Sequence, residues 1–293
     1  FSRVQESTAD ASGARYLSAA GISGKGSINF FKKLQNLEFR YGATANDDAY
    51  GRTHPLSGER VTVLEDSYRA DPAWDTPLNP KWEKEFPRIR AKLIGFILDP
   101  KDVLRRYPES DSSVAARYAR AYAWHRAAYP DKARGEIASL LAQEPDNPYF
   151  LELSGQIDLE SGDPEAALES LRRATALTGA HPLIAALFGH ALIATEDPAR
   201  FAEAEQVLKA AVAKDRENPF AWLQMGIVYD QRGDHARASL ASAERQAMMT
   251  DYPQALRSAE AAMAGLPEYS ADWLRAQDIK LAAEAELSRK KRD

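Results

Sequence analysis

The chain has 293 residues and no cysteine, and its 38 basic and 43 acidic side chains give a formal net charge of −5. Without cysteine there is no disulfide framework, no cysteine-ligated zinc or iron–sulfur site and no thiol nucleophile. The acidic balance disfavours the basic surface that nucleic-acid binding needs, so we expect no nucleic-acid partner. No apolar run is long enough to cross a bilayer, so we expect no transmembrane segment.

The first predicted element is a helix over residues 1–21. Glu6 and Asp10 are four positions apart on it, so they share one face. The segment 41–59 is polar and rich in turn residues, which predicts a loop.

Residues 80–106 have the pattern of an amphipathic helix that connects two parts of the chain. Ile89, Leu93, Ile94 and Ile97 recur at helical spacing. We expect these side chains either in the core or at a contact between the domains.

Composition changes sharply after residue 110. The first 110 residues contain 11 alanines, whereas the remaining 183 contain 41. Alanine is the best helix former and allows helices to approach closely. The second stretch is therefore predicted to be almost entirely helical.

The second stretch also carries an internal repeat. Gly155, Gly189 and Gly226 are 34 and 37 residues apart, and each is followed by an alanine 12 or 15 positions later. This spacing predicts a unit of about 34 residues, with three extra residues in the turn at 196–200. Four to five such units would cover about 112–265.

The unit pattern resembles the tetratricopeptide repeat, a helix–turn–helix motif. Its second helix carries an alanine, a large apolar residue four positions later and a small residue three further on. Two units satisfy this pattern, at Ala167-Leu171-Ala174 and Ala204-Leu208-Ala211. The third unit departs from it at Ser242 and Arg245, so we expect its second helix to double as the first helix of the next unit.

Stacked units of this kind form a curved array whose inner surface holds a peptide or a partner protein. We therefore expect protein or peptide ligands in its groove, although no sequence feature identifies them. The predicted organisation is residues 1–79, connecting helices at 80–110, repeats at 111–267, and a capping helix with a tail at 268–293.

The N-terminal helix resembles one element of a known enzyme family. Glu6-x-x-x-Asp10, with Ala9, Gly13 and Tyr16 around it, is similar to the second metal-site helix of the zinc metallopeptidases related to CAAX prenyl proteases and the BepA/YfgC-like proteases. This resemblance implies that Glu6 is a zinc ligand. It also implies that Asp10 contacts a ligating histidine and holds it in the orientation that binds the metal.

A second segment, Thr53-His54-Pro55 followed by Arg60, resembles a sequence that lies beside the active site in that family. The resemblance implies that His54 approaches the metal or the substrate. It implies that Arg60 stabilises a developing oxyanion or pairs with an acidic residue of the site. The implied fold is mainly α, with the remnant of a gluzincin-type metallopeptidase domain followed by a tetratricopeptide superhelix.

The family also has a His-Glu-x-x-His helix that supplies two zinc ligands and the general base. These 293 residues contain no such motif. Because the chain starts at Phe1 and its first methionine is Met225, we expect the motif in a preceding segment. The chain alone is then expected to be inactive.

Two hypotheses follow. In the first, the chain is part of an exported bacterial zinc endopeptidase whose repeats bind substrates or membrane-assembly machinery. In the second, it is a non-catalytic scaffold of repeats. The family resemblance implies a periplasmic location, whereas the composition is equally compatible with the cytoplasm.

Overall fold

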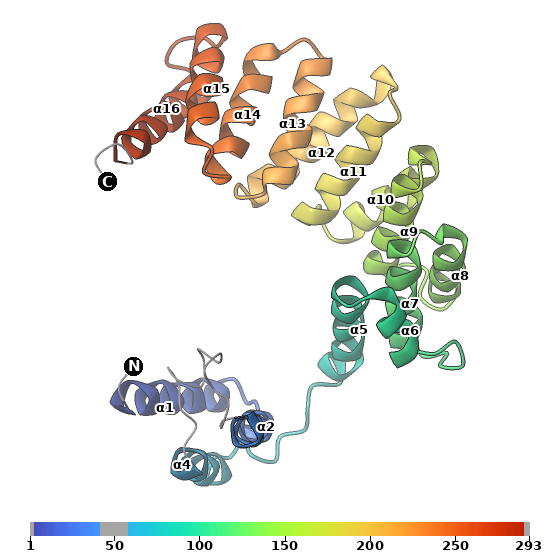
Figure 1. Cartoon of the computed structure of the whole chain (residues 1–293), viewed down its shortest axis with the longest axis vertical. Coiled ribbons are helices and arrows are strands. Elements are labelled where there is room, and N and C mark those ends of the chain that lie inside the picture. The colour runs from blue at the N-terminus through green and yellow to red at the C-terminus, as the bar shows by residue number, and fades with distance from the viewer. Residues whose placement is uncertain (1–2, 42–57, 290–293) are drawn as a thin grey trace. The chain divides into compact units, whose positions relative to one another are not determined.

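The computed structural model describes residues 3–41 and 58–289, and every regular element within these ranges is a helix (Figure 1). The chain divides into two compact units, residues 1–87 and 88–293. No helix in the described ranges combines the length and apolar character needed to cross a membrane. The mainly helical fold predicted from the sequence is confirmed.

The first unit contains helices α1 (Arg3–Ala19), α2 (Lys25–Tyr41) and α4 (Gly58–Arg69). Ile28 on α2 packs with Leu64 and Tyr68 on α4, and these three side chains form its described core. Gly24, just before α2, lies directly against the Tyr68 ring, where a Cβ atom would come within 2.1 Å of a ring carbon. The turn into α2 therefore needs a glycine.

Helix α5 (Pro80–Ile97) runs across the boundary between the units, and α6 (Pro100–Arg106) follows it. A position in the core, one of the two alternatives expected from the sequence, is wrong for three of the four predicted apolar residues of α5, whereas a contact between the domains stays a prediction. Ile89, Leu93 and Ile97 are exposed, and Ile94 is only partly buried. Within the second unit, α5 packs through small residues instead, chiefly the buried Ala91 and Gly95.

The close approach of α5 explains this outcome. A Cβ atom on Gly95 would lie 2.7 Å from the backbone oxygen of Ala119 on helix α7 (Val114–Arg126). Two helices can come this near only through small side chains, so Ala91 and Gly95 form the contact surface of α5 with α7. The large apolar residues of α5 are consequently on the other faces of the helix.

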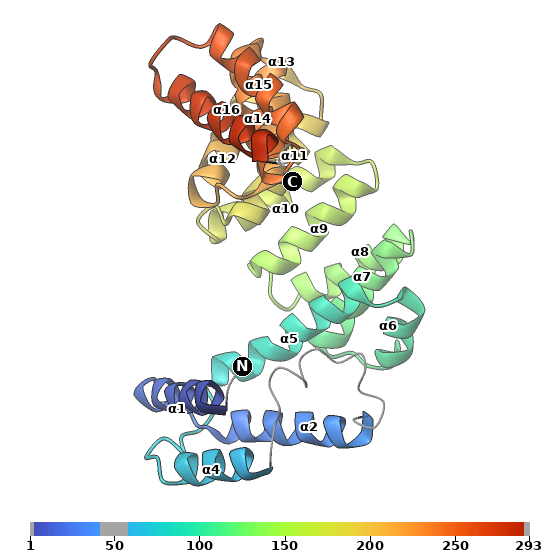
Figure 2. The ribbon, with the colours of Figure 1, turned by 60° about the vertical axis from the view of Figure 1, so that its left-hand side comes forward.

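From α7 onward the second unit consists of antiparallel helix pairs stacked one after another (Figures 1 and 2). The pairs are α7 with α8 (Pro130–Leu141), α9 (Pro148–Glu160) with α10 (Pro164–Leu177), α11 (Pro182–Ala194) with α12 (Phe201–Lys214), and α13 (Pro219–Gln231) with α14 (His235–Met248). Helices α15 (Tyr252–Gly265) and α16 (Ala271–Arg289) follow α14. The three extra residues expected near 196–200 form the short 3₁₀ helix η2 (Pro198–Arg200).

The glycines of the repeat have a packing function. A Cβ atom on Gly155 would lie 2.4 Å from Leu171 Cγ, and one on Gly189 would lie 2.5 Å from Leu208 Cγ. In both pairs the leucine of the second helix therefore rests directly on the glycine of the first. This contact is why glycine and leucine recur together at the repeat spacing.

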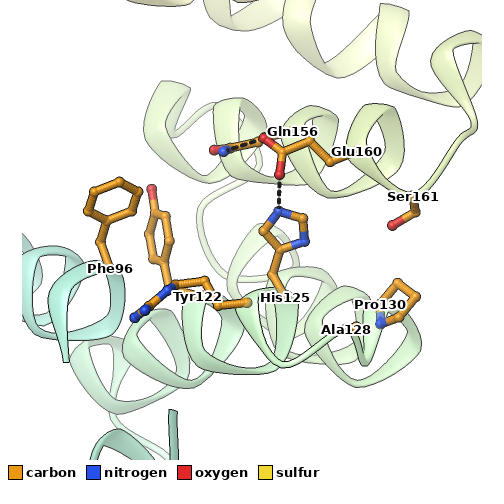
Figure 3. A pocket seen from close by; sticks show the side chains of 9 residues that line it. Phe96, Tyr122, His125, Ala128, Pro130, Gln156, Glu160 and Ser161 are labelled. Atoms are coloured by element: carbon orange, nitrogen blue, oxygen red, sulfur yellow. Dashed lines mark hydrogen bonds and ion pairs between the residues drawn. The ribbon is translucent and has the colours of Figure 1, made fainter. Parts of the chain in front are cut away.

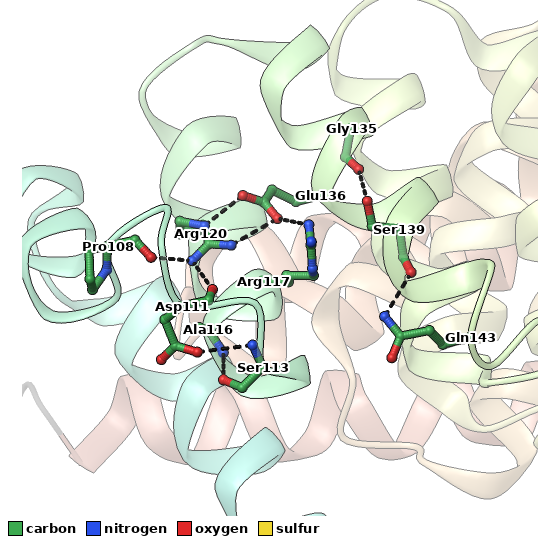
Figure 4. Close-up of polar contacts among 10 residues, drawn as sticks. All are labelled: Pro108, Asp111, Ser113, Ala116, Arg117, Arg120, Gly135, Glu136, Ser139 and Gln143. Atoms are coloured by element: carbon green, nitrogen blue, oxygen red, sulfur yellow. Dashed lines mark hydrogen bonds and ion pairs between the residues drawn. The ribbon is translucent and has the colours of Figure 1, made fainter.

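A buried arginine fixes the start of the repeats (Figure 4). The side chain of Arg120 on α7 is 1% exposed, and its Nε donates to Glu136 Oε1 on α8 at 2.6 Å. Its Nη1 donates to the backbone oxygens of Pro108 and Asp111, both at 2.8 Å. One side chain thus joins α7, α8 and the loop after α6.

Candidate functional site

Glu6 and Asp10 share one face of α1, as their four-residue spacing predicts, and in the structure this face meets α4. Arg60, in the first turn of α4, binds both carboxylates. Its Nη2 lies 2.9 Å from Glu6 Oε2 and donates to Asp10 Oδ1 at 2.9 Å, while its Nε donates to Asp10 Oδ2. Three of the four predicted site residues therefore meet in one cluster.

This cluster is largely shielded from water. The side chains of Glu6, Asp10 and Arg60 are 11%, 10% and 15% exposed. The hydrogen bond to Asp10, with the negative charges of both carboxylates, raises the pKa of Arg60 above its usual value, and only desolvation opposes this effect. Arg60 consequently stays cationic at all physiological pH values and balances one of the two negative charges that Glu6 and Asp10 can carry.

The fourth predicted residue, His54, lies outside the described residues. The metal roles of Glu6 and Asp10 therefore stay predictions. A catalytic zinc ion needs three protein ligands. Within residues 3–41 and 58–289 no group of three or more histidine or acidic side chains could hold a metal ion. The described residues alone do not fit a zinc site, because Glu6 supplies one carboxylate at most.

Comparison with known proteins bears directly on this segment. Residues 1–67 match the model of peptidase family M48. The matched range contains Glu6, Asp10, His54 and Arg60, and M48 is a family of zinc metallopeptidases. The resemblance predicted from these residues is confirmed at the level of sequence.

The chain is also similar to two curated proteases. The Beta-barrel assembly-enhancing protease of Yersinia pestis is 27% identical over 207 residues, which are 68% of this chain and 41% of that protein. The protein of the same name from Escherichia coli strain K12 is 24% identical over 229 residues, which are 76% and 45% of the two chains. The chain thus spans less than half the length of these relatives.

Two solved structures show a weaker likeness. MamA is 20% identical, with a TM-score of 0.43 over 59% of this chain and 97% of the other. A thermophilic TPR protein of Thermus thermophilus is 19% identical, with a TM-score of 0.40 over 62% and 99%. The helix pairs of the second unit are themselves of the tetratricopeptide type, so the chain is a protease-related protein with such repeats.

The second unit contains a pocket that the sequence analysis did not predict (Figure 3). Its volume is about 770 Å³, and Phe96 and Tyr122 form an aromatic wall. On the opposite side His125 Nε2 lies 2.8 Å from Glu160 Oε2, and Gln156 Nε2 donates to Glu160 Oε1 at 2.8 Å.

The hydrogen bond from His125 lowers the pKa of the Glu160 carboxyl. The sequence holds a signal for this pair, since His125 and Glu160 are 35 residues apart and occupy equivalent ends of first helices. The position of His125 in a repeat helix predicts a structural or solvated side chain, and His125 does take part in a contact between neighbouring pairs.

Proposed function

We propose that this chain is part of an exported bacterial zinc-dependent endopeptidase whose repeats bind protein substrates or partners. The observation that carries the proposal is the cluster of Glu6, Asp10 and Arg60 within the segment that matches family M48. The repeats support the second half of the proposal, because stacked helix pairs offer an extended surface for peptides.

Within this proposal Glu6 is the carboxylate ligand of zinc and Asp10 orients a ligating histidine. Arg60 and His54 lie beside the substrate. A His-Glu-x-x-His pair and its general base are absent from the 293 residues, so a part of the protein outside them would supply these groups. The chain alone is accordingly expected not to hydrolyse peptides.

The name of the two curated relatives supports a role in membrane-protein assembly. Both are called Beta-barrel assembly-enhancing protease. By analogy, we propose that the chain works in the periplasm, in the quality control of outer-membrane proteins, and that its repeats contact the assembly machinery or its clients. The net charge of −5 fits protein partners better than nucleic acid.

The decisive experiment expresses this chain together with the coding sequence that precedes Phe1. Zinc content is measured by mass spectrometry, and cleavage is followed on an unfolded protein such as casein. We expect bound zinc, cleavage activity, and a loss of zinc affinity of at least about tenfold in Glu6→Gln. The matched control is Glu109→Gln, which changes an exposed glutamate in the loop after α6.

Two results would contradict the proposal at different points. Unchanged zinc affinity in Glu6→Gln would remove Glu6 from the ligand set. A longer protein that neither binds zinc nor cleaves casein would leave the second candidate function, a non-catalytic repeat scaffold. The specific observation favouring that alternative is Arg60, whose guanidinium pairs with both Glu6 and Asp10 and thus gives the two carboxylates a structural role.

A further inference from the structure

The α13/α14 pair lacks the leucine-on-glycine contact that the α9/α10 and α11/α12 pairs have. In those pairs Leu171 and Leu208 are fully buried and lie against Gly155 and Gly189. The equivalent position opposite Gly226 is occupied by Ser242. A Cβ atom on Gly226 would make only ordinary contacts, the nearest at 3.6 Å, so α14 rests no large side chain on this glycine.

A second position at the contact between α13 and α14 also differs in chemistry from the other pairs. Three positions after the leucine, the α9/α10 and α11/α12 pairs have Ala174 and Ala211, both completely buried. The α13/α14 pair has Arg245 there, which is partly exposed. An apolar contact between two helices has thus been replaced by a short hydroxyl side chain and a guanidinium group.

These changes coincide with a pocket of about 650 Å³ between α13, α14 and α15. Its α13 wall presents Trp222, Leu223 and Ile227. The Trp222 indole nitrogen donates to the backbone oxygen of Arg216 at 2.8 Å, which anchors this ring at the pocket. Helices α14 and α15 supply the other walls, which include Arg245 and Arg257.

The charges of the pocket favour an anion. Arg245 and Arg257 form no ion pair or side-chain hydrogen bond within the part of the chain that the structure describes. The acidic residue of the lining, Asp230, is engaged by His235 Nδ1 at 2.9 Å. Two guanidinium groups against the single carboxylate of Asp230 give the lining a net positive charge, in a chain whose net charge is −5.

We propose that this pocket binds a peptide segment that carries a carboxylate next to an apolar side chain. A guanidinium group matches a carboxylate with two parallel hydrogen bonds, which gives both strength and orientation. The apolar neighbour of the carboxylate packs on Trp222, Leu223 and Ile227. The proposal rests on the proposed function of the repeats as a peptide-binding array, but it is independent of zinc.

Fluorescence anisotropy on the 293-residue chain tests this site. The probe is a fluorescein-labelled peptide of alternating leucine and glutamate, and the matched probe has glutamine in place of glutamate. We expect the acidic peptide to bind and the neutral peptide to bind at least about tenfold more weakly. Failure of the acidic peptide to bind would refute the site but leave the zinc experiment unaffected.

Three variants then locate the binding. Arg245→Gln combined with Arg257→Gln removes both cations of the pocket. Ser242→Leu introduces the leucine that the α9/α10 and α11/α12 pairs have at this position, and its side chain fills the pocket. Each is expected to raise the Kd of the acidic peptide at least about tenfold. Arg106→Gln, an exposed arginine on α6, is the control and leaves the Kd unchanged.

Thermal unfolding of each variant separates loss of the site from loss of the fold. Ser242→Leu is expected to keep or raise the Tm while abolishing binding, which a general unfolding effect would not do. If Ser242→Leu and the double variant both bind as the parent chain does, the pocket is not the site. If inorganic phosphate at the concentration of the peptide displaced the peptide, the pocket would be a phosphate site, and this result would also overturn the proposal.

Discussion

At the scale of single residues, two arginines each join separate helices through carboxylates. Arg60 connects α4 to α1, and Arg120 connects α7 to α8. The sequence predicts part of the first cluster, because the spacing of Glu6 and Asp10 already places them on one helix face. It does not predict that one guanidinium binds both, since that contact depends on how two helices distant in the sequence pack together.

The buried pair of Arg120 and Glu136 gives a prediction for stability. The Glu136 side chain is 13% exposed and accepts from Nε and Nη2 of Arg120 and from Arg117. Glu136→Gln leaves the buried guanidinium without its counter-charge. We expect the free energy of unfolding to fall by about 3 kcal/mol, as measured by urea denaturation.

The control for this change is another glutamate that pairs between helices at the surface. Glu203 binds Arg172, and both side chains are more than a third exposed. Glu203→Gln is expected to cost less than about 1 kcal/mol. Equal losses in the two variants would mean that burial of Arg120 does not determine the strength of its ion pair.

At the scale of helices, periodicity predicts which residues share a face but does not decide which face packs. Helix α5 shows the limit. Both the isoleucines and the pair Ala91 and Gly95 recur at helical spacing. The tight approach of α5 to α7 selects the small residues, and that approach is a property of two helices together. The repeats were easier to predict, because each unit repeats the same pair contact.

The repeat glycines allow a prediction with a control inside the same fold. In Gly155→Ala and Gly189→Ala the new methyl group collides with Leu171 or Leu208, so we expect each to lose about 1–3 kcal/mol of stability. Gly226→Ala meets no such neighbour. It is expected to be neutral or to gain up to about 1 kcal/mol from the higher helix propensity of alanine.

Thermal and urea unfolding of the three alanine variants measures this difference. The three glycines occupy equivalent helix positions, so helix propensity contributes equally to all of them and only the space opposite differs. If Gly226→Ala lost as much stability as the other two variants, the contact between α13 and α14 would be as close as those in the α9/α10 and α11/α12 pairs. That result would also remove the structural basis of the pocket beside Ser242.

At the scale of the whole chain, the division into two units determines how the protein unfolds. In the described residues the buried cluster of the first unit consists of Ile28, Leu64 and Tyr68. The largest cluster of the second unit has 19 buried members, all between Leu159 and Ala241. Since a small core supplies little stability on its own, we expect the first unit to unfold at a lower temperature than the repeats.

Differential scanning calorimetry of the 293-residue chain should therefore show two transitions. Leu64→Ala removes core volume only from the first unit and should lower only the first transition, whereas Leu208→Ala should lower only the second. Each deletion of a buried leucine is expected to cost about 2–5 kcal/mol. A single transition shifted by both variants would mean that the two units unfold together. In that case the isolated repeats could not be assumed to keep their fold without the segment that matches family M48.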